Sequence, residues 1–434
     1  MRSSNVSASI WATALGAWLG WVMDSYDLSM MFLLIVPMSL LFFPKEAAYF
    51  AIIGTLSVYF LTLVFRPLGG FIFGILGDKL GRKRSMLISL IGLGSAVFLT
   101  GLLPTYAAIG IAAPILLGVM RSIIGVFAGG EYGNSAAILM ENISNKTRGR
   151  IGGFLQGGYP VGFTLAALVY LVLQRTLLPG DFLQLGWRIM FFTGLLPALA
   201  GLVIRLKMPE SFVWHKTLES EGVESTPIRT LFKNRLHLSA WLSGFLAMAG
   251  ISWLYSLTLG FYPTILPSFA KISPLVSTYV VIVAILSSLV GYLLSGLVSD
   301  YVGRKKALAL FALLGSVASV PSMYVILRGA FGLTNVTIAA SLLAFFTTGA
   351  YGVIPSYLSE KFPTKIRSTG VGSSFNAGFI IGSWSSVLTL LFAGVLGLSN
   401  LFWIAGAAIV IGELFIAASV LMSNETYNKD LGSI

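Results

Sequence analysis

Charged side chains inside long apolar segments are the residues of this sequence best suited to chemistry. An ionised group at the centre of a bilayer is costly, so it must pair with an opposite charge or change its protonation state. Apolar segments contain six such residues: Asp24, Asp27, Arg66, Arg121, Glu131 and Glu413. Two arginines therefore face four carboxyl groups, and these carboxyl groups are candidates to bind and release protons.

Asp24 and Asp27 are three residues apart, so both carboxyl groups lie on the same side of a helix and can face one cavity. A neighbouring arginine favours the ionised form of an aspartate, whereas burial favours the neutral form. An aspartate whose arginine partner is drawn away therefore takes up a proton. This is the behaviour that couples proton movement to a conformational change. The alternative is that such pairs only fasten helices together.

The composition is that of an integral membrane protein. Of the 434 residues, 56% are hydrophobic and 10% are charged, whereas soluble domains carry about 25% charged residues. A helix needs about 20 apolar residues to cross the bilayer core. Apolar runs lie near 9–43, 49–76, 85–103, 109–140, 151–174, 187–207, 237–268, 273–298, 306–327, 334–358, 369–396 and 399–422. The sequence therefore predicts an all-α membrane protein with twelve transmembrane helices.

The distribution of basic residues predicts the orientation. The net charge of +12 would suggest a nucleic-acid partner in a soluble chain, but most lysines and arginines here lie in the loops of one side. Basic residues accumulate in cytoplasmic loops. We therefore expect a multi-pass protein of the cytoplasmic membrane, with both termini in the cytoplasm, the lipid bilayer as its surroundings and no nucleic-acid partner.

Two repeated motifs divide the chain into related halves. GILGDKLGRKR at 74–84 recurs as GLVSDYVGRKK at 296–306. A second pair keeps the same spacing in each half: Glu141 with Arg148, and Glu360 with Arg367. Such duplication predicts two six-helix bundles related by a pseudo-two-fold axis, with a solute site between them. The expected parts are an N-terminal bundle at 1–206, a cytoplasmic linker at 207–236 and a C-terminal bundle at 237–434.

These motifs resemble those of the major facilitator superfamily. Besides the two repeated loops, Arg121 and Gly125 form its R-x-x-x-G sequence, and P-E-S occurs at 209–211. The segment SEKFPTKIRSTG at 359–370 also has a form typical of this superfamily. The D-x-x-D segment of the first helix resembles that of organic-acid symporters within the superfamily. The chain also resembles the sugar porters of the superfamily. This resemblance implies transport by alternating access.

The repeated loops suggest a gate. Gly81 and Gly303 permit tight turns, and Asp78 and Asp300 can meet helix ends or arginines. The resemblance implies that this network holds the two halves together in one conformation, although the charges could serve orientation alone. The expected gate residues are Gly74, Asp78, Gly81, Arg82, Lys83, Glu141, Arg148, Asp300, Gly303, Arg304, Glu360 and Arg367.

By the same resemblance, an aspartate of the first helix pairs with the arginine of R-x-x-x-G. Asp27 with Arg121 is the first pairing expected, and Asp24 with Arg66 or Arg121 is the second. We expect Glu131 to neutralise Arg66, and Glu413 to be peripheral. The candidates for solute binding are Arg66, Arg121, Tyr26, Gln156, Trp253, Tyr255, Tyr262, Tyr351 and Asn376.

The sequence favours proton-coupled symport of a small organic acid, such as a monocarboxylate, by a monomeric carrier. The alternatives are a sugar or polyol symporter and a drug exporter, although IGGFLQGGYPVGF at 151–163 only partly resembles the exporter signature. A membrane enzyme or sensor is disfavoured because no nucleophile cluster or nucleotide-binding loop occurs. There is no cysteine, and His215 and His237 lie in a polar stretch. We therefore expect no metal site and no cofactor.

Overall fold

The computed structural model describes residues 2–44, 48–328 and 332–431, and its regular elements there are all helical. The first half comprises α1 (Arg2–Leu33), α2 (Ile35–Phe42), α3 (Ala48–Leu80), α4 (Arg82–Gly101), α5 (Tyr106–Ile109), α6 (Ala112–Glu141), α7 (Arg148–Gln156), α8 (Gly158–Thr176), α9 (Pro179–Asp181), the π-helical turn η2 (Phe182–Gly186), α10 (Trp187–Thr193) and α11 (Leu195–Lys207). Two short helices follow, α12 (Phe212–Glu221) and α13 (Pro227–Lys233).

The second half repeats this pattern. It comprises α14 (Arg235–Leu257), α15 (Tyr262–Ser268), α16 (Pro274–Val302), α17 (Arg304–Arg328), α18 (Gly332–Gly349), η3 (Ala350–Val353), α19 (Ile354–Ser359), η4 (Thr364–Ile366), α20 (Arg367–Gly382), α21 (Ser385–Leu396), η5 (Leu398–Asn400) and α22 (Leu401–Met422). Here η3, η4 and η5 are 3-10 turns.

The predicted number of membrane-spanning helices is confirmed. Within the described residues, eleven helical segments are long and apolar enough to cross a membrane, and α1 with α2 forms a further span that bends by 66°. The break follows from Pro37, which has no N–H to donate to the Leu33 carbonyl one turn earlier. The first predicted span, the apolar run at 9–43, is therefore a broken helix.

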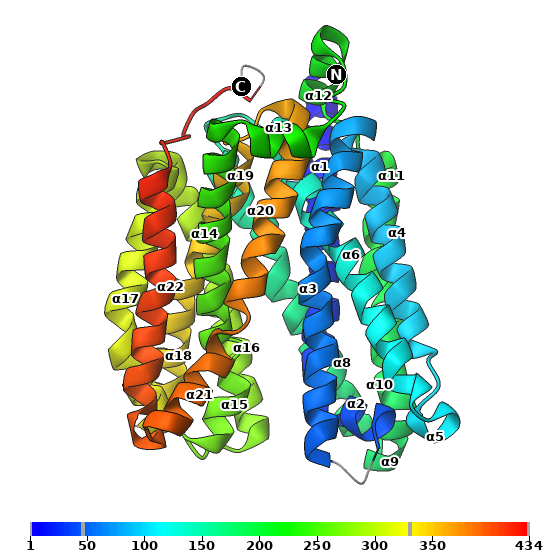
Figure 1. The fold of residues 1–434 in the computed structure, drawn as a ribbon, viewed down its shortest axis with the longest axis vertical. Helices are drawn as coiled ribbons and strands as arrows, with labels where there is room; N and C mark the ends of the chain where they lie inside the picture. The colour runs from blue at the N-terminus through cyan, green and yellow to red at the C-terminus, as the bar shows by residue number, and fades with distance from the viewer. Residues whose placement is uncertain (1, 45–47, 329–331, 432–434) are drawn as a thin grey trace.

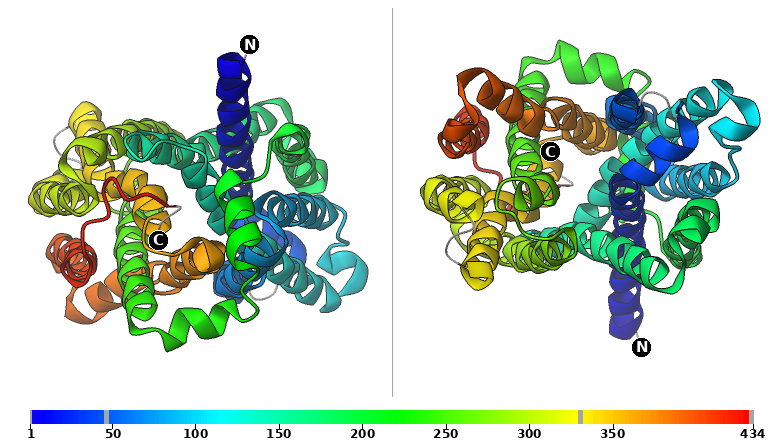
Figure 2. Two further views of the ribbon diagram at one scale, coloured as in Figure 1. Left: turned by 90° about the horizontal axis from the view of Figure 1, so that it is seen from above. Right: turned by 90° about the horizontal axis from the view of Figure 1, so that it is seen from below.

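The helices form two groups that lie side by side (Figure 1), as the view along the bundle in Figure 2 also shows. The start of α1, the end of α22 and the linking helices α12 and α13 lie together at one end of the molecule. We call this the terminal end, and the opposite one the distal end. The two groups meet where α20 packs against α3 and α6, and where α16 packs against α7.

Glycines let α3 and α6 pack closely enough to place the charged residues. A Cβ at Gly69 would collide with the Val126 carbonyl, and one at Gly129 would collide with the carbonyl of Arg66. Small residues allow helix backbones to approach in this way in membranes. The contact fixes Arg66 at the centre of the molecule, where α20 also passes.

Candidate functional site

At the terminal end, Asp78 of α3 joins the first half to the second. Its carboxylate accepts hydrogen bonds from the backbone N–H groups of Ser368 (3.0 Å) and Thr369 (2.9 Å), and from the Thr369 hydroxyl (2.7 Å). These residues form the first turn of α20, where N–H groups lack helical partners and the helix dipole favours an anion. The approach is close, since a Cβ at Gly74 would collide with the Thr369 backbone.

Asp300 of α16 makes the matching contact in the opposite sense. Its carboxylate accepts hydrogen bonds from the N–H groups of Gly149 (2.7 Å) and Arg150 (2.9 Å), in the first turn of α7. Arg304 Nη1 also donates to Asp300 Oδ1, at 2.8 Å. Each half therefore caps a helix of the other half with an aspartate from its repeated loop.

Two buried glutamates complete this contact. Glu141 Oε1 lies 3.2 Å from Arg82 Nη2 of its own half and 2.6 Å from Arg367 Nη1 of the other half. Glu360 takes the equivalent place in the second half. Its Oε1 lies 3.0 Å from Arg304 Nη2, and 3.9 Å from Arg148 Nη1 across the interface. Burial raises the pKa of Glu360, and the hydrogen bonds from Arg304 oppose this effect.

The glycines of the repeated loops have left-handed backbones, with φ of 104° at Gly81 and 97° at Gly303. A side chain would strain both turns. After Gly81, the N–H groups of Arg82 and Lys83 donate to Glu210, at 3.1 and 3.0 Å. After Gly303, the next two N–H groups donate to Glu425 at 2.9 and 3.1 Å. The structure thus places all twelve predicted gate residues in one region at the terminal end.

At the centre, Asp24 and Arg66 form a two-pronged ion pair. Arg66 Nη1 lies 2.8 Å from Asp24 Oδ1, and Nη2 lies 2.6 Å from Oδ2. The third donor of the guanidinium group, Nε, bonds to the Asn376 side-chain oxygen at 3.0 Å. Arg66 is completely buried and Asp24 is 1% exposed. A residue of the second half therefore completes the coordination of a pair that belongs to the first half.

A second pair lies one helical turn further along α1. Arg121 Nη1 bonds to both oxygens of Asp27, at 3.1 and 3.0 Å. The guanidinium carbon lies 5.5 Å from the Phe191 ring centroid. Arg121 Nε and Nη2 are buried and have no hydrogen-bond partner in the described part of the chain. Both pairings considered from the sequence, Asp27 with Arg121 and Asp24 with Arg66, are therefore present.

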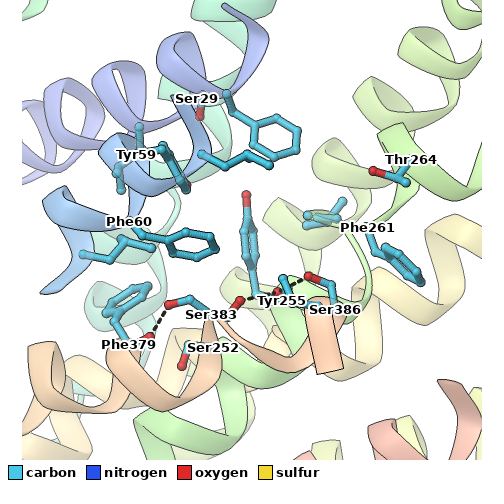
Figure 3. A pocket seen from close by; sticks show the side chains of 18 of the residues that line it. Ser29, Tyr59, Phe60, Ser252, Tyr255, Phe261, Thr264, Phe379, Ser383 and Ser386 are labelled. Carbon is cyan, nitrogen blue, oxygen red and sulfur yellow. Dashed lines mark hydrogen bonds between the residues drawn. The ribbon is translucent and has the colours of Figure 1, made fainter. Parts of the chain in front are cut away.

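A cavity of about 340 Å³ lies between the two halves on the distal side of these pairs. Tyr59, Phe60 and Phe379 lie on one side of it, and Phe261 and Thr264 on the other (Figure 3). The remaining polar lining consists of Ser29, Tyr159, Ser252, Tyr255, Ser256, Ser383 and Ser386. No charged side chain is part of its described lining. This site suits a small solute with an apolar body and a few hydrogen-bonding groups.

Comparison with known proteins assigns the chain to a family. The model of the family "Sugar (and other) transporter" matches residues 46–226 and 216–431. The chain belongs to this family. It is 30% identical to the inner membrane metabolite transport protein YhjE of Escherichia coli over 348 residues. This alignment covers 79% of this chain and 78% of YhjE. It is also 29% identical to the proline/betaine transporter of E. coli over 429 residues, and this alignment covers 95% of this chain and 83% of that transporter.

The fold is that of the major facilitator superfamily. The proton:xylose symporter XylE of E. coli superposes with a TM-score of 0.78 and 19% identity over 98% of each chain. The predicted fold and superfamily are confirmed. The relatives and structural neighbours of this chain are transporters. The chain is likewise a membrane transporter and not an enzyme.

Most predicted solute-binding residues do not line the cavity of this transporter. Of the nine, Tyr255 does, and its hydroxyl group accepts a hydrogen bond from Tyr159 at 3.2 Å. Arg66, Arg121 and Asn376 belong to the ion pairs. The others lie within the helix packing: Tyr26 bonds to Thr193, Trp253 to Ala408 and Tyr262 to Ala340, Tyr351 packs on Tyr292, and Gln156 is buried.

The expected pairing of Glu131 with Arg66 is wrong. Glu131 forms a buried ion pair with Arg205 of α11 instead, and Arg205 Nη1 also donates to the Met86 carbonyl at 2.8 Å. Arg205 ends an apolar run, so its position suggested a cytoplasmic loop. Its long side chain instead turns inward and is completely buried. Because both groups are buried, each charge requires the other: either charge alone in this place would be costly.

Glu413 is not part of the cavity lining, in line with the expected peripheral place, but it is buried within the second half. It is 4% exposed, and its carboxyl group faces Gly315 of α17 inside the second half. Neither of its oxygens has a hydrogen-bond partner in the described chain. The segment after α22 was also missed: Arg148 donates to the Lys429 carbonyl (2.7 Å) and Arg367 to the Leu431 carbonyl (3.0 Å), so this segment crosses the contact between the halves.

Proposed function

We propose that this transporter couples proton movement to symport of a small organic acid by alternating access. This proposal rests on one observation: two buried aspartate–arginine pairs lie beside a cavity between the halves. A buried carboxylate paired with a guanidinium group can be neutralised by a proton, and the freed guanidinium group can then bind an anion. Protonation and anion binding therefore favour each other.

The closed contact at the terminal end supports the proposed gate. With the termini in the cytoplasm, as the basic loops favour, the aspartate caps and glutamate–arginine bridges close the cytoplasmic side. The cavity lies on the opposite, external side. Both halves of one chain form it, which supports a monomeric carrier in the cytoplasmic membrane. Breaking the contact would let the halves rock apart and expose the solute to the cytoplasm.

A carboxylate solute is favoured by the charges at the centre. Arg66 and Arg121 are the cations of the two central ion pairs, and Asp24 and Asp27 balance them. Protonation of one aspartate leaves one positive charge, which matches a monocarboxylate. Proline and betaine, the solutes in the name of one relative, both carry a carboxyl group. The aromatic lining suits the apolar part of a monocarboxylate, and it could also contact the cationic nitrogen of proline or betaine.

The test is solute-driven proton entry into proteoliposomes that contain a pH-sensitive dye. Lactate, pyruvate, dicarboxylates, aromatic acids, proline, betaine and hexoses would be screened. We expect a monocarboxylate to move protons with it. Asp24→Asn or Asp27→Asn should abolish uphill accumulation while counterflow exchange continues. Glu413→Gln removes a buried carboxyl group away from the cavity and should leave accumulation intact. Uphill uptake in both aspartate variants would contradict the coupling.

A sugar or polyol symporter is the second candidate. Hydroxyl groups of Ser29, Ser256 and Ser386 line the cavity, and such groups bind the hydroxyls of a neutral solute. Proton entry driven by xylose or a hexose, and not by any monocarboxylate in the same screen, would establish this candidate instead.

A further inference from the structure

Phe379 of α20 lies against both the cavity and the Asp24–Arg66 pair. Its ring is part of the cavity lining, and the Arg66 guanidinium carbon lies 5.3 Å from the ring centroid. The ring is 8% exposed, whereas Arg66 is 0% and Asp24 is 1% exposed. A guanidinium group is attracted to the face of an aromatic ring at this distance, more strongly where water is excluded. The ring therefore contacts the cavity and the ion pair at once.

Asn376 holds the same guanidinium group from the same helix. It lies three residues before Phe379, so both side chains project from one side of α20. The Asn376 oxygen accepts from Arg66 Nε at 3.0 Å, and its amide group donates to the Gly129 carbonyl of α6 at 2.9 Å. The second half thus contacts Arg66 through an amide at its edge and an aromatic ring over its face.

The surrounding charges make a proton on Asp24 costly unless an anion arrives with it. Asp27 is engaged by Arg121, and Glu131 by Arg205. A proton on Asp24 breaks its bonds to Arg66 and leaves that buried guanidinium group without a counter-ion, which is unfavourable. A solute carboxylate that reaches Arg66 restores the balance. The pair, the proton and the solute then carry the same net charge as the unprotonated pair.

We propose that Phe379 is a positioning residue that makes protonation of Asp24 depend on the solute. With the ring in place, protons from water in the cavity do not reach the carboxylate. A bound solute displaces the ring. A proton from cavity water then adds to Asp24, the Asp24–Arg66 bonds break, and Arg66 donates its hydrogen bonds to the solute carboxylate. This inference rests on the proposed proton coupling and adds the element that prevents proton leakage.

The test measures proton entry without any solute. Purified protein would be reconstituted in liposomes containing a pH-sensitive dye, with the membrane potential clamped by potassium and valinomycin, and the outside would be acidified. The wild-type chain should admit protons little faster than empty liposomes. Phe379→Ala should admit them at least about tenfold faster, because water then enters the space left by the ring, delivers protons to Asp24 and solvates the Arg66 guanidinium group. Adding Asp24→Asn to this variant should restore the slow rate.

Three variants serve as controls. Phe379→Tyr keeps the ring and should remain tight. Phe60→Ala removes another cavity ring, which stacks on Trp384 at 5.1 Å, and should also remain tight. Phe379→Leu lacks the flat aromatic face and should leak, so it replaces the alanine variant if that protein is unstable.

The proposal fails if the alanine and leucine variants stay tight, if their leak persists with Asp24→Asn, or if Phe60→Ala leaks equally. Failure of proton coupling itself would be distinct: the wild-type chain would then show no solute-driven proton entry in the screen described above.

Discussion

Replacing Asp78 by alanine should open the contact at the terminal end. The change removes three hydrogen bonds between a carboxylate of the first half and the first turn of α20 in the second. One such bond to a charged group contributes about 1.5–3 kcal/mol. The three share one carboxylate, and water replaces them when the halves separate, so we take about 3 kcal/mol for the set. That shifts the ratio of closed to open forms by about a hundredfold.

A single cysteine reports this opening, because the chain has no cysteine of its own. Ala137 suits this purpose. It is completely buried and lies between Gly133 and Glu141 on the side of α6 that meets α20. The rate of maleimide labelling of Ala137→Cys would be measured in detergent. Adding Asp78→Ala should raise the rate toward about a hundredfold.

Two controls accompany this measurement. Asp78→Asn keeps an acceptor oxygen without the charge and should raise the labelling rate less. Asp181→Asn removes an exposed carboxylate of the first half and should leave the rate unchanged. A labelling rate with Asp78→Ala within twofold of the parent would refute the idea that this cap holds the halves together.

Two other predictions concern stability. Glu131→Gln should lower the midpoint of thermal unfolding, since removing one partner of a buried ion pair costs about 3–5 kcal/mol; Glu131→Leu combined with Arg205→Met should be less destabilised than Glu131→Gln, and an unchanged midpoint in the single variant would contradict this. Burial acts to raise the pKa of Glu425, but hydrogen bonds from backbone N–H groups, including those of Tyr427 and Arg304, outweigh burial and hold this pKa below its ordinary value. Its ionised form therefore stabilises the folded chain above about pH 4.5, and this stabilisation is lost as the pH falls further. In Glu425→Gln the melting midpoint should fall less steeply between about pH 5 and pH 3 than in the wild type, and a wild-type slope in that variant would count against this assignment.

The sequence predicts the parts of this molecule that follow from spacing. Twelve apolar runs give the spans, and the repeated loops place Asp78 and Asp300 at matching positions in the two halves. A buried charge in a span needs a partner, which narrows the choice for Asp24 and Asp27 to two arginines. For these elements, local pattern and the cost of burial determine the structure.

The parts that depend on side-chain reach and packing were not predictable in this way. Arg205 ends an apolar run like any loop arginine, and only the inward turn of its side chain reveals the pair with Glu131. The cavity is lined by common residues such as serine and phenylalanine, with no distinguishing spacing. Conspicuous aromatic and amide residues such as Trp253 and Asn376 instead serve the packing or the ion pair. Lining depends on which helix sides face one another, and periodicity within one segment does not report this.

The helix α20 connects the two regions that the sequence motifs identify separately. Its first turn is capped by Asp78 at the terminal end, and Asn376 and Phe379 hold Arg66 further along the same helix. Ser368 and Phe379 are about 16 Å apart along the helix axis. A helix of this length moves as one body, so a separation that releases Ser368 from Asp78 also withdraws the amide and the ring from Arg66. In the proposed mechanism, opening at the terminal end would then expose the protonated aspartate and the solute together, and release of both would restore the ion pair.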